Sequence, residues 1–199
     1  GYVIGLMFIK DVNVRDPNTL LDYIFITVIA HEPGEHFVYS NVGPYIISAL
    51  IKEEIGINLS SWVANLLFSK LGIVEYSWTN YGKYCSASSG LKLLHADLHK
   101  IARLFMNCGR HGSEQVVPEH WINLMRTPQI VTPTMYDEKR VFPKYAYGYY
   151  LWICKDGRYY CDGTDGQYFI ILPTSGIVIT TFGHQQDMKP ITQCLTALL

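Results

Sequence analysis

Residues 155–182 read KDGRYYCDGTDGQYFIILPTSGIVITTF and have the pattern of an antiparallel sheet. Asp156-Gly157 lies at the centre of a short polar turn, which is a strong signal for a β-hairpin. Aromatic and β-branched residues flank this turn and a later one, Pro173–Gly176. The expected strands are Tyr147–Cys154, Tyr159–Asp162, Gln167–Leu172 and Ile177–Phe182.

Before residue 143 the apolar residues are spaced mostly as in helices. The clearest case runs from Leu94 to Phe105, where apolar residues recur at i, i+4, i+7, i+8 and i+11 before a glycine, Gly109, suited to a C-terminal cap. Other helices are expected over 20–29 and 45–51, over 62–68 with Ser60 or Ser61 as the cap, after Pro118, and over 187–199. We therefore expect an α+β fold that is incomplete at its N-terminus. A mainly helical region 1–143 and a region 144–199 of antiparallel strands plus a C-terminal helix are expected to pack as one domain with the missing N-terminal segment.

Composition excludes several classes of protein. Hydrophobic residues make up 49% of the 199 residues, which argues against extended disorder. Sixteen basic and seventeen acidic residues give a net charge of −1, so no nucleic-acid partner is expected. The longest apolar runs, Tyr23–Ala30 and Tyr45–Ile51, are far shorter than the ~20 residues of a membrane span, and none is expected in this chain.

The five cysteines are widely spaced and include no Cys-x-x-Cys pair, so free thiols are expected rather than disulfides or a zinc site. His95 and His99 lie one helical turn apart, which leaves a zinc site as a minor alternative. The glutamate of a metalloprotease helix is missing, because Ala96 follows His95. No metal and no cofactor is expected.

The segment Pro33–Gly43 carries the residues of greatest chemical interest. Tyr39, Ser40 and Asn41 lie between a Pro-Gly turn and an apolar helix, and loops held by helices often carry reactive side chains. A tyrosine whose pKa is lowered by nearby positive charge serves as a general base, and an asparagine amide orients a carbonyl substrate. The alternative is an ordinary helix start with Ser40 or Asn41 as the cap.

Several segments, in order, resemble the serine β-lactamase and penicillin-binding-protein family, in its class C-related branch of hydrolases and esterases. Tyr39-Ser40-Asn41 is similar to its Tyr-x-Asn motif, and Gly163–Gln167 is similar to the region of its third motif. The remaining matches are Leu66–Ile73, Trp78, Ser88–Leu91 with Asp97-Leu98 and Arg103-Leu104, Asn107–Arg110, Trp121 to Met125, Tyr147–Tyr149 and Pro173. The resemblance covers the chain from about residue 24 to residue 199 and implies acyl transfer or hydrolysis of an amide or ester, including β-lactam or peptidoglycan peptide bonds.

In that family the third motif is a Lys-Thr-Gly or His-x-Gly triplet that contacts the substrate carboxylate and helps to form the oxyanion hole. The corresponding triplet here is Cys161-Asp162-Gly163, followed by Thr164. The glycine is present, but Cys161 lacks the cation, and an ionised Asp162 would repel a carboxylate. The resemblance therefore implies catalytic roles for Tyr39 and Asn41. It implies substrate contacts at Ser40 and at residues 161–164, with a neutral ester or amide as the better substrate.

The family nucleophile is the serine of an upstream Ser-x-x-Lys motif, and residues 1–39 contain no serine. Ser89-Gly90-Leu91-Lys92 fits the pattern literally, but it falls where the family has a Gly-Gly-Leu turn, so we interpret it as a chance match.

We expect this chain to be the C-terminal portion of such a hydrolase, inactive in isolation. The alternative is a catalytically silent binding or regulatory domain, or one half of a two-chain assembly. Expected partners are the small-molecule substrate and either the missing N-terminal segment or a second copy bound through an exposed sheet edge. The resemblance favours the cell envelope, whereas the free cysteines are compatible with the cytoplasm.

Overall fold

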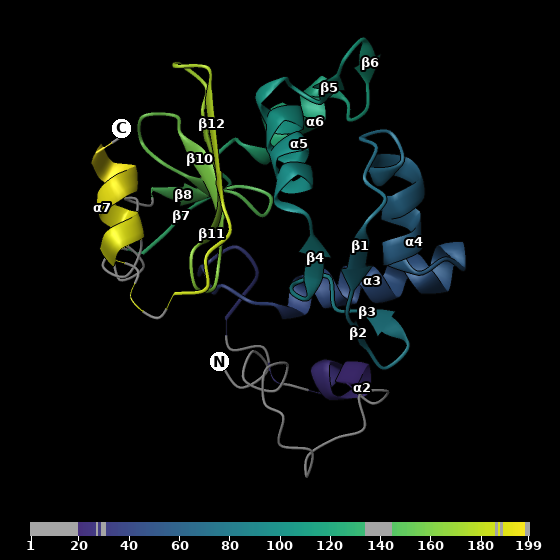
Figure 1. Cartoon of the computed structure of the whole chain (residues 1–199). Helices are drawn as coiled ribbons and strands as arrows, with labels where there is room; N and C mark the ends of the chain where they lie inside the picture. Colours follow the sequence, from purple (N-terminus) through teal and green to yellow (C-terminus); the bar gives the residue numbers. More distant parts are fainter. Residues whose placement is uncertain are drawn as a thin grey trace. The chain divides into compact units, whose positions relative to one another are not determined.

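The computed structural model describes residues 20–26, 28, 31–133, 145–185, 187 and 189–197. The chain divides into two compact units, Gly1–Leu93 and Leu94–Leu199 (Figure 1). The boundary expected at residue 143 falls outside the described residues. The division after Leu93 follows from packing, because helix α5 (His95–Met106) packs on the strands of the second unit.

The first unit is built around helix α3 (Val42–Ile55), which confirms the helix expected there. Tyr45 and Ala49 lie one turn apart on its buried face and form a small core with Leu20 and Tyr84. Leu20 belongs to helix α2 (Leu20–Phe25), and Tyr84 to strand β3 (Tyr84–Cys85). Gly56 ends α3 with φ 77°, and its N–H donates to the carbonyl oxygen of Lys52 at 2.9 Å.

Helix α4 (Leu59–Val63) continues directly into a π-helical turn, η2 (Ala64–Phe68). Its cap differs from the expected serine: the Asn58 side chain accepts from the Ser60 N–H at 3.3 Å. Two small antiparallel pairs follow. Strand β1 (Tyr76–Trp78) pairs with β4 (Leu91–Leu93), and β2 (Asn80–Tyr81) pairs with β3.

The second unit contains a six-stranded antiparallel sheet in the order β12-β11-β10-β9-β8-β7. Strands β10 (Tyr159–Gly163) and β11 (Gln167–Leu172) match the strands predicted over 159–162 and 167–172, and the hairpin predicted at Asp156-Gly157 joins β9 to β10. The predicted strand 147–154 is wrong as a single element, because Gly148 N–H donates to Leu151 O at 2.9 Å and turns the chain back on itself. The remaining strands are β7 (Ile130–Val131), β8 (Ala146–Tyr147), β9 (Trp152–Ile153) and β12 (Ile177–Thr181).

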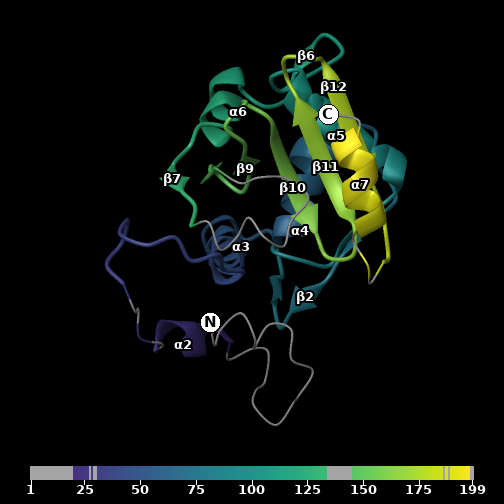
Figure 2. The same ribbon diagram turned by 90° about the vertical axis from the view of Figure 1, so that its left-hand side faces the viewer.

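Helices lie on both faces of this sheet. Figures 1 and 2 show α5 on one face and α7 (Lys189–Ala197) on the other. The core on the α5 side gathers Ala102 of the helix with Tyr159, Phe169 and Ile171 of the sheet. Helix α6 (Glu119–Met125) starts after Pro118, and a small hairpin of β5 (Arg110–His111) and β6 (Glu114–Gln115) connects it to α5.

Candidate functional site

The Tyr39-Ser40-Asn41 segment leads directly into the first turn of α3. Ser40 Oγ accepts from the Val42 N–H at 3.1 Å, so the serine satisfies one of the unpaired N–H groups at the helix start. Asn41 occupies the N-cap position but makes no side-chain cap hydrogen bond, and it is only 8% exposed. The cap role proposed for this segment therefore belongs to Ser40. The buried amide of Asn41 has no part in it.

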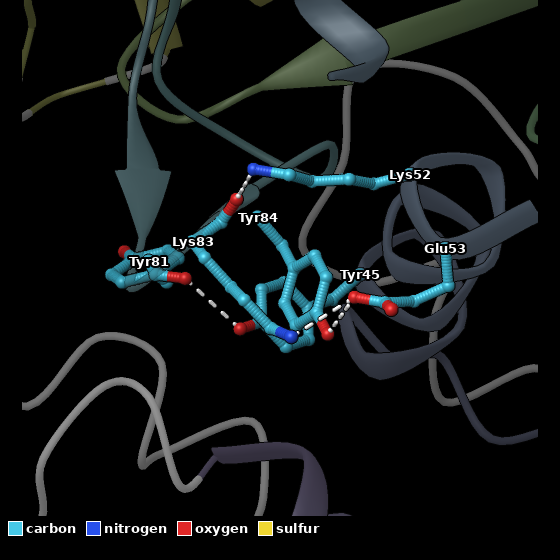
Figure 3. A network of polar contacts seen from close by, with 6 residues as sticks. All are labelled: Tyr45, Lys52, Glu53, Tyr81, Lys83 and Tyr84. Carbon is cyan, nitrogen blue, oxygen red and sulfur yellow. Dashed lines mark hydrogen bonds and ion pairs between the residues drawn. The ribbon is translucent and has the colours of Figure 1, made fainter. Parts of the chain in front are cut away.

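A polar network holds α3 against the β2–β3 hairpin (Figure 3). Tyr45 Oη donates to Tyr81 O at 3.0 Å, and Lys52 Nζ donates to Lys83 O at 2.7 Å. The Glu53 carboxylate accepts from Tyr84 Oη at 2.7 Å and from Lys83 Nζ at 3.0 Å. These hydrogen bonds lower the pKa of Glu53, with the bond from Tyr84 as the largest cause. The network fixes α3, and with it the start of the helix where Asn41 lies.

Cys161, Asp162 and Gly163 form the end of strand β10, an interior strand of the sheet. They pair with Phe169, Tyr168 and Gln167 of β11. Alternation along the strand directs Cys161 and Asp162 to opposite faces. A Cβ on Gly163 would lie 2.8 Å from Gln167 Oε1, so the missing side chain also makes room for its cross-strand neighbour.

The side chains of Cys161 and Asp162 have different surroundings. Cys161 packs against the core on the α5 side, and its thiol donates to Tyr150 O at 3.4 Å. Burial, with a smaller effect of Asp162, raises the pKa of the Cys161 thiol to about 12, so the group is neutral near pH 7. Asp162 Oδ1 accepts from Trp152 Nε1 at 2.9 Å. The carboxylate therefore has a structural partner in the sheet.

The turn between β10 and β11 is tied to the end of β12 and to the segment that follows it. Thr181 Oγ1 donates to Gly166 O at 2.7 Å, Gly183 N–H donates to the same oxygen at 3.1 Å, and Gln185 N–H donates to Asp165 O at 3.2 Å. Thr164 itself is exposed at the turn. The backbone beyond Gly163 is thus held in place at a solvent-accessible edge.

The literal Ser-x-x-Lys match has the wrong geometry for a nucleophile and its base. Ser89 lies in a turn where its carbonyl oxygen accepts from Trp78 Nε1 at 3.1 Å and from Ser86 Oγ. Lys92 is an exposed residue of strand β4. The two residues therefore do not share a helical face, which a Ser-x-x-Lys pair requires.

The histidine pair of α5 contacts the sheet. His95 Nε2 and His99 Nδ1 lie 3.1 Å and 3.3 Å from Thr180 Oγ1 of β12. Within the part of the chain that the structure describes, no group of three or more His, Cys, Asp or Glu side chains is arranged to hold a metal ion. Over the same residues, none of the helices combines the length and the apolar character that crossing a bilayer requires.

Sequence reasoning missed two residues beside β10. Trp152 of β9 pairs with Tyr160, so it is the diagonal neighbour of Asp162 on the same face. Tyr150, whose carbonyl binds the Cys161 thiol, has the backbone conformation of a glycine, with φ 61°. The predicted unbroken strand 147–154 concealed both relationships, because residues 148–151 form a turn.

No protein-family profile and no curated protein sequence matches the chain. Several solved structures are similar in fold. A protein from Bacillus anthracis described as a 6-aminohexanoate-dimer hydrolase superimposes with a TM-score of 0.77 at 20% identity, over 99% of this chain and 52% of that one.

A penicillin-binding protein from Bacillus halodurans gives a TM-score of 0.74 at 19% identity, over 99% of this chain and 68% of that one. A protein from Bacteroides dorei described as a β-lactamase gives 0.68 at 16% identity, over 94% of this chain and 65% of that one. The chain thus spans between about half and two thirds of the length of these proteins. It has the β-lactamase and penicillin-binding-protein fold that the ordered motifs predicted.

Proposed function

We propose that this chain is the C-terminal portion of a β-lactamase-like serine hydrolase or acyltransferase. The observation that carries the proposal is that the buried Asn41 side chain, at the N-cap of α3, makes no cap hydrogen bond. A buried amide at an N-cap position normally accepts from the helix backbone, but here Ser40 makes that bond and Asn41 does not. An amide placed in this way is suited to orienting the carbonyl or amide of a substrate.

The proposed reaction is acyl transfer through a serine supplied from outside the chain described here. The serine oxygen attacks the acyl carbon, and its proton passes to a base formed by Tyr39 together with the family's lysine. Backbone at Thr164 helps to hold the oxyanion of the tetrahedral intermediate, and Asn41 orients the substrate. The leaving alcohol or amine takes the proton, and water or another acceptor then releases the acyl group.

The proposed substrate is a neutral ester or amide. The Lys or His of the family motif is replaced by Cys161, whose neutral thiol offers no charge to a carboxylate. Asp162 supplies a carboxylate at the next position, and its bond to Trp152 keeps it in the sheet. Neither Cys161 nor Asp162 therefore supplies a cation for an anionic substrate at this end of β10.

The test is covalent labelling with a fluorophosphonate probe, followed by intact-mass measurement. We would label this chain alone and the full-length product of its gene. We expect no adduct on the chain alone and one adduct on the full-length product. Tyr39→Phe should slow labelling about a hundredfold or more, the scale of general-base catalysis. Tyr76→Phe, in an exposed strand of the same unit, should leave the rate unchanged.

The second candidate is a catalytically silent binding domain with the same fold. The replacement of the motif cation by a neutral thiol favours it. Absence of any adduct on the full-length product would support this candidate and contradict the hydrolase. Labelling that Tyr39→Phe leaves unchanged would retain the hydrolase but remove Tyr39 from its mechanism.

A further inference from the structure

Tyr150 has an unusual backbone conformation for a bulky residue. Its φ of 61° lies in the left-handed region, which glycine and asparagine adopt readily and tyrosine rarely does. Such conformations carry a cost in free energy and persist only where the surrounding structure imposes them. Some other interaction must therefore offset the free-energy cost of this backbone conformation at Tyr150.

The turn that contains Tyr150 is held by its neighbours. Gly148 N–H donates to Leu151 O, and Tyr149 N–H donates to Met125 O at 3.1 Å. A Cβ on Gly148 would lie 2.0 Å from Met125 O, so helix α6 and the turn are in close contact there. These contacts involve the backbone of the turn and would form equally well with glycine at position 150. The tyrosine ring is therefore not needed to shape the turn.

Core packing also gives an incomplete explanation of the ring. Tyr150 is 46% exposed, although it is shielded enough for burial to raise the pKa of its phenol. A side chain with nearly half of its surface in water recovers only part of the free energy that full burial would provide. A strained, half-exposed aromatic residue is the pattern that points to a ligand contact.

The backbone of Tyr150 lies next to one of the candidate site residues. Its carbonyl oxygen accepts from the thiol of Cys161, which is one of the predicted substrate-contact residues on β10. The preceding residue, Tyr149, stacks on Trp121 of α6 with ring centroids 5.7 Å apart and planes inclined by 19°. Tyr149 is 42% exposed and Trp121 is 43% exposed. Three partly exposed aromatic side chains are thus carried by the turn beside β10 and the helix that holds it.

We propose that Tyr150 is a specificity-determining residue that contacts a flat aromatic group of the substrate beside Cys161. This inference rests on the proposed function, since it assigns a substrate class to the same site. Aromatic rings pack favourably against one another in offset and edge-to-face arrangements, beyond the effect of buried area alone. A neutral amide or ester with an aromatic acyl or amine portion fits both this residue and the uncharged thiol next to it.

The experiment measures binding and stability in the same variants. Binding of phenylacetamide and of hexanamide, an aromatic and a linear neutral amide, is followed by NMR chemical-shift changes on this chain. Tyr150→Gly removes the ring and relieves the strain, and Tyr150→Phe keeps both. Cys108→Gly is the matched control, because Cys108 has φ 51° and lies in the loop after α5.

We expect the wild-type chain to bind phenylacetamide more tightly than hexanamide. Tyr150→Gly should weaken phenylacetamide binding about threefold to tenfold, leave hexanamide binding unchanged, and raise the Tm by about 2–4 °C. Tyr150→Phe should keep the preference for phenylacetamide over hexanamide. Cys108→Gly should raise the Tm and leave this preference unchanged.

A lower Tm for Tyr150→Gly would show that the ring is structural and would overturn the inference. So would an unchanged preference, or binding of neither amide to the wild-type chain. Aromatic preference without acylation of the full-length product would contradict only the proposed function. Acylation without aromatic preference would contradict only the role of Tyr150.

Discussion

Asp162 shows how one residue at a candidate site can serve the fold. Its carboxylate accepts from the indole of Trp152, which is 2% exposed. Removing an acceptor from a buried donor costs about 1–3 kcal/mol. We expect Asp162→Ala to lower the free energy of unfolding by this amount in denaturant titrations. Asp162→Asn keeps an oxygen at the same position, so its free energy of unfolding should fall clearly less. Equal decreases for the two variants would contradict this role.

A second prediction for a single residue concerns alkylation of the Cys161 thiol. Because burial raises its pKa to about 12, the thiolate is scarce at all pH values well below that. We expect Cys161 to resist alkylation by N-ethylmaleimide near neutral pH in the native protein and to react after denaturation, as measured by peptide mass mapping. Cys194 is exposed and serves as the control that reacts in the native state. Rapid native alkylation of Cys161 would show that the thiol is accessible and ionised.

The sequence could identify the candidate residues but not their surroundings. The ordered motifs led to Tyr39, Asn41 and residues 161–164 because these residues are close in sequence to recognisable turns and helices. The bond from Trp152 to Asp162 depends on strand register, and the bond from Cys161 to Tyr150 depends on a turn that aromatic, β-branched composition concealed. Register and turn conformation are properties of paired strands, so a single run of residues does not reveal them.

At the scale of the element, the stability of helix α3 depends on pH through the phenol of Tyr45. Burial, with a smaller contribution from Tyr84, raises the pKa of the Tyr45 phenol to about 12. The unfolded chain therefore releases this proton first, near pH 10. The contribution of the neutral phenol is fully present below pH 10 and is lost as the pH rises toward 12.

The measurement for this prediction is unfolding by denaturant at a series of pH values between about 8 and 12. Over this range the free energy of unfolding of the wild-type chain should fall by up to about 2 kcal/mol more than that of Tyr45→Phe, because phenylalanine has no proton to release. Tyr45→Phe also removes the bond to Tyr81 O, so it should be less stable below pH 10. Parallel pH profiles for the two proteins would contradict the prediction.

Helices and strands were predictable to different degrees for a physical reason. The 3.6-residue spacing of apolar side chains located α5 and α3, each of which buries one face. Strands β10 and β11 were located from the turn residues around them and from their aromatic and β-branched composition. The cap of α4 was missed because serine and asparagine are both good caps, and the choice between Ser60 and Asn58 depends on the path of the chain.

At the scale of the whole molecule, composition divides the chain differently from packing. Helical patterning extends to residue 143, but the helix α5 belongs with the sheet because its apolar stripe lies on β11 and β12. A pattern along the chain records which residues are buried and not what covers them. Fold class was therefore predictable, and the boundary expected at residue 143, which lies outside the described residues, stays a prediction.

The edge of the six-stranded sheet leads to a prediction about assembly. Strand β12 forms one edge of the sheet. Its residues Ile177–Thr181 include neither a charged residue nor a proline, the residue types that protect exposed edges from pairing. Ile177, at the start of the strand, is an exposed apolar residue. We predict that two copies of the chain associate by pairing their β12 edges.

Sedimentation velocity over a wide range of protein concentration measures this association. The average mass of the wild-type chain should rise above 22.7 kDa with concentration. Ile177→Lys places a charge on each paired edge and should hold the chain near the monomer mass, because like charges across paired strands repel. Val74→Lys changes an exposed apolar residue outside the sheet and should leave association intact. A monomer at every concentration, or equal effects of the two lysines, would mean that the β12 edge does not mediate pairing.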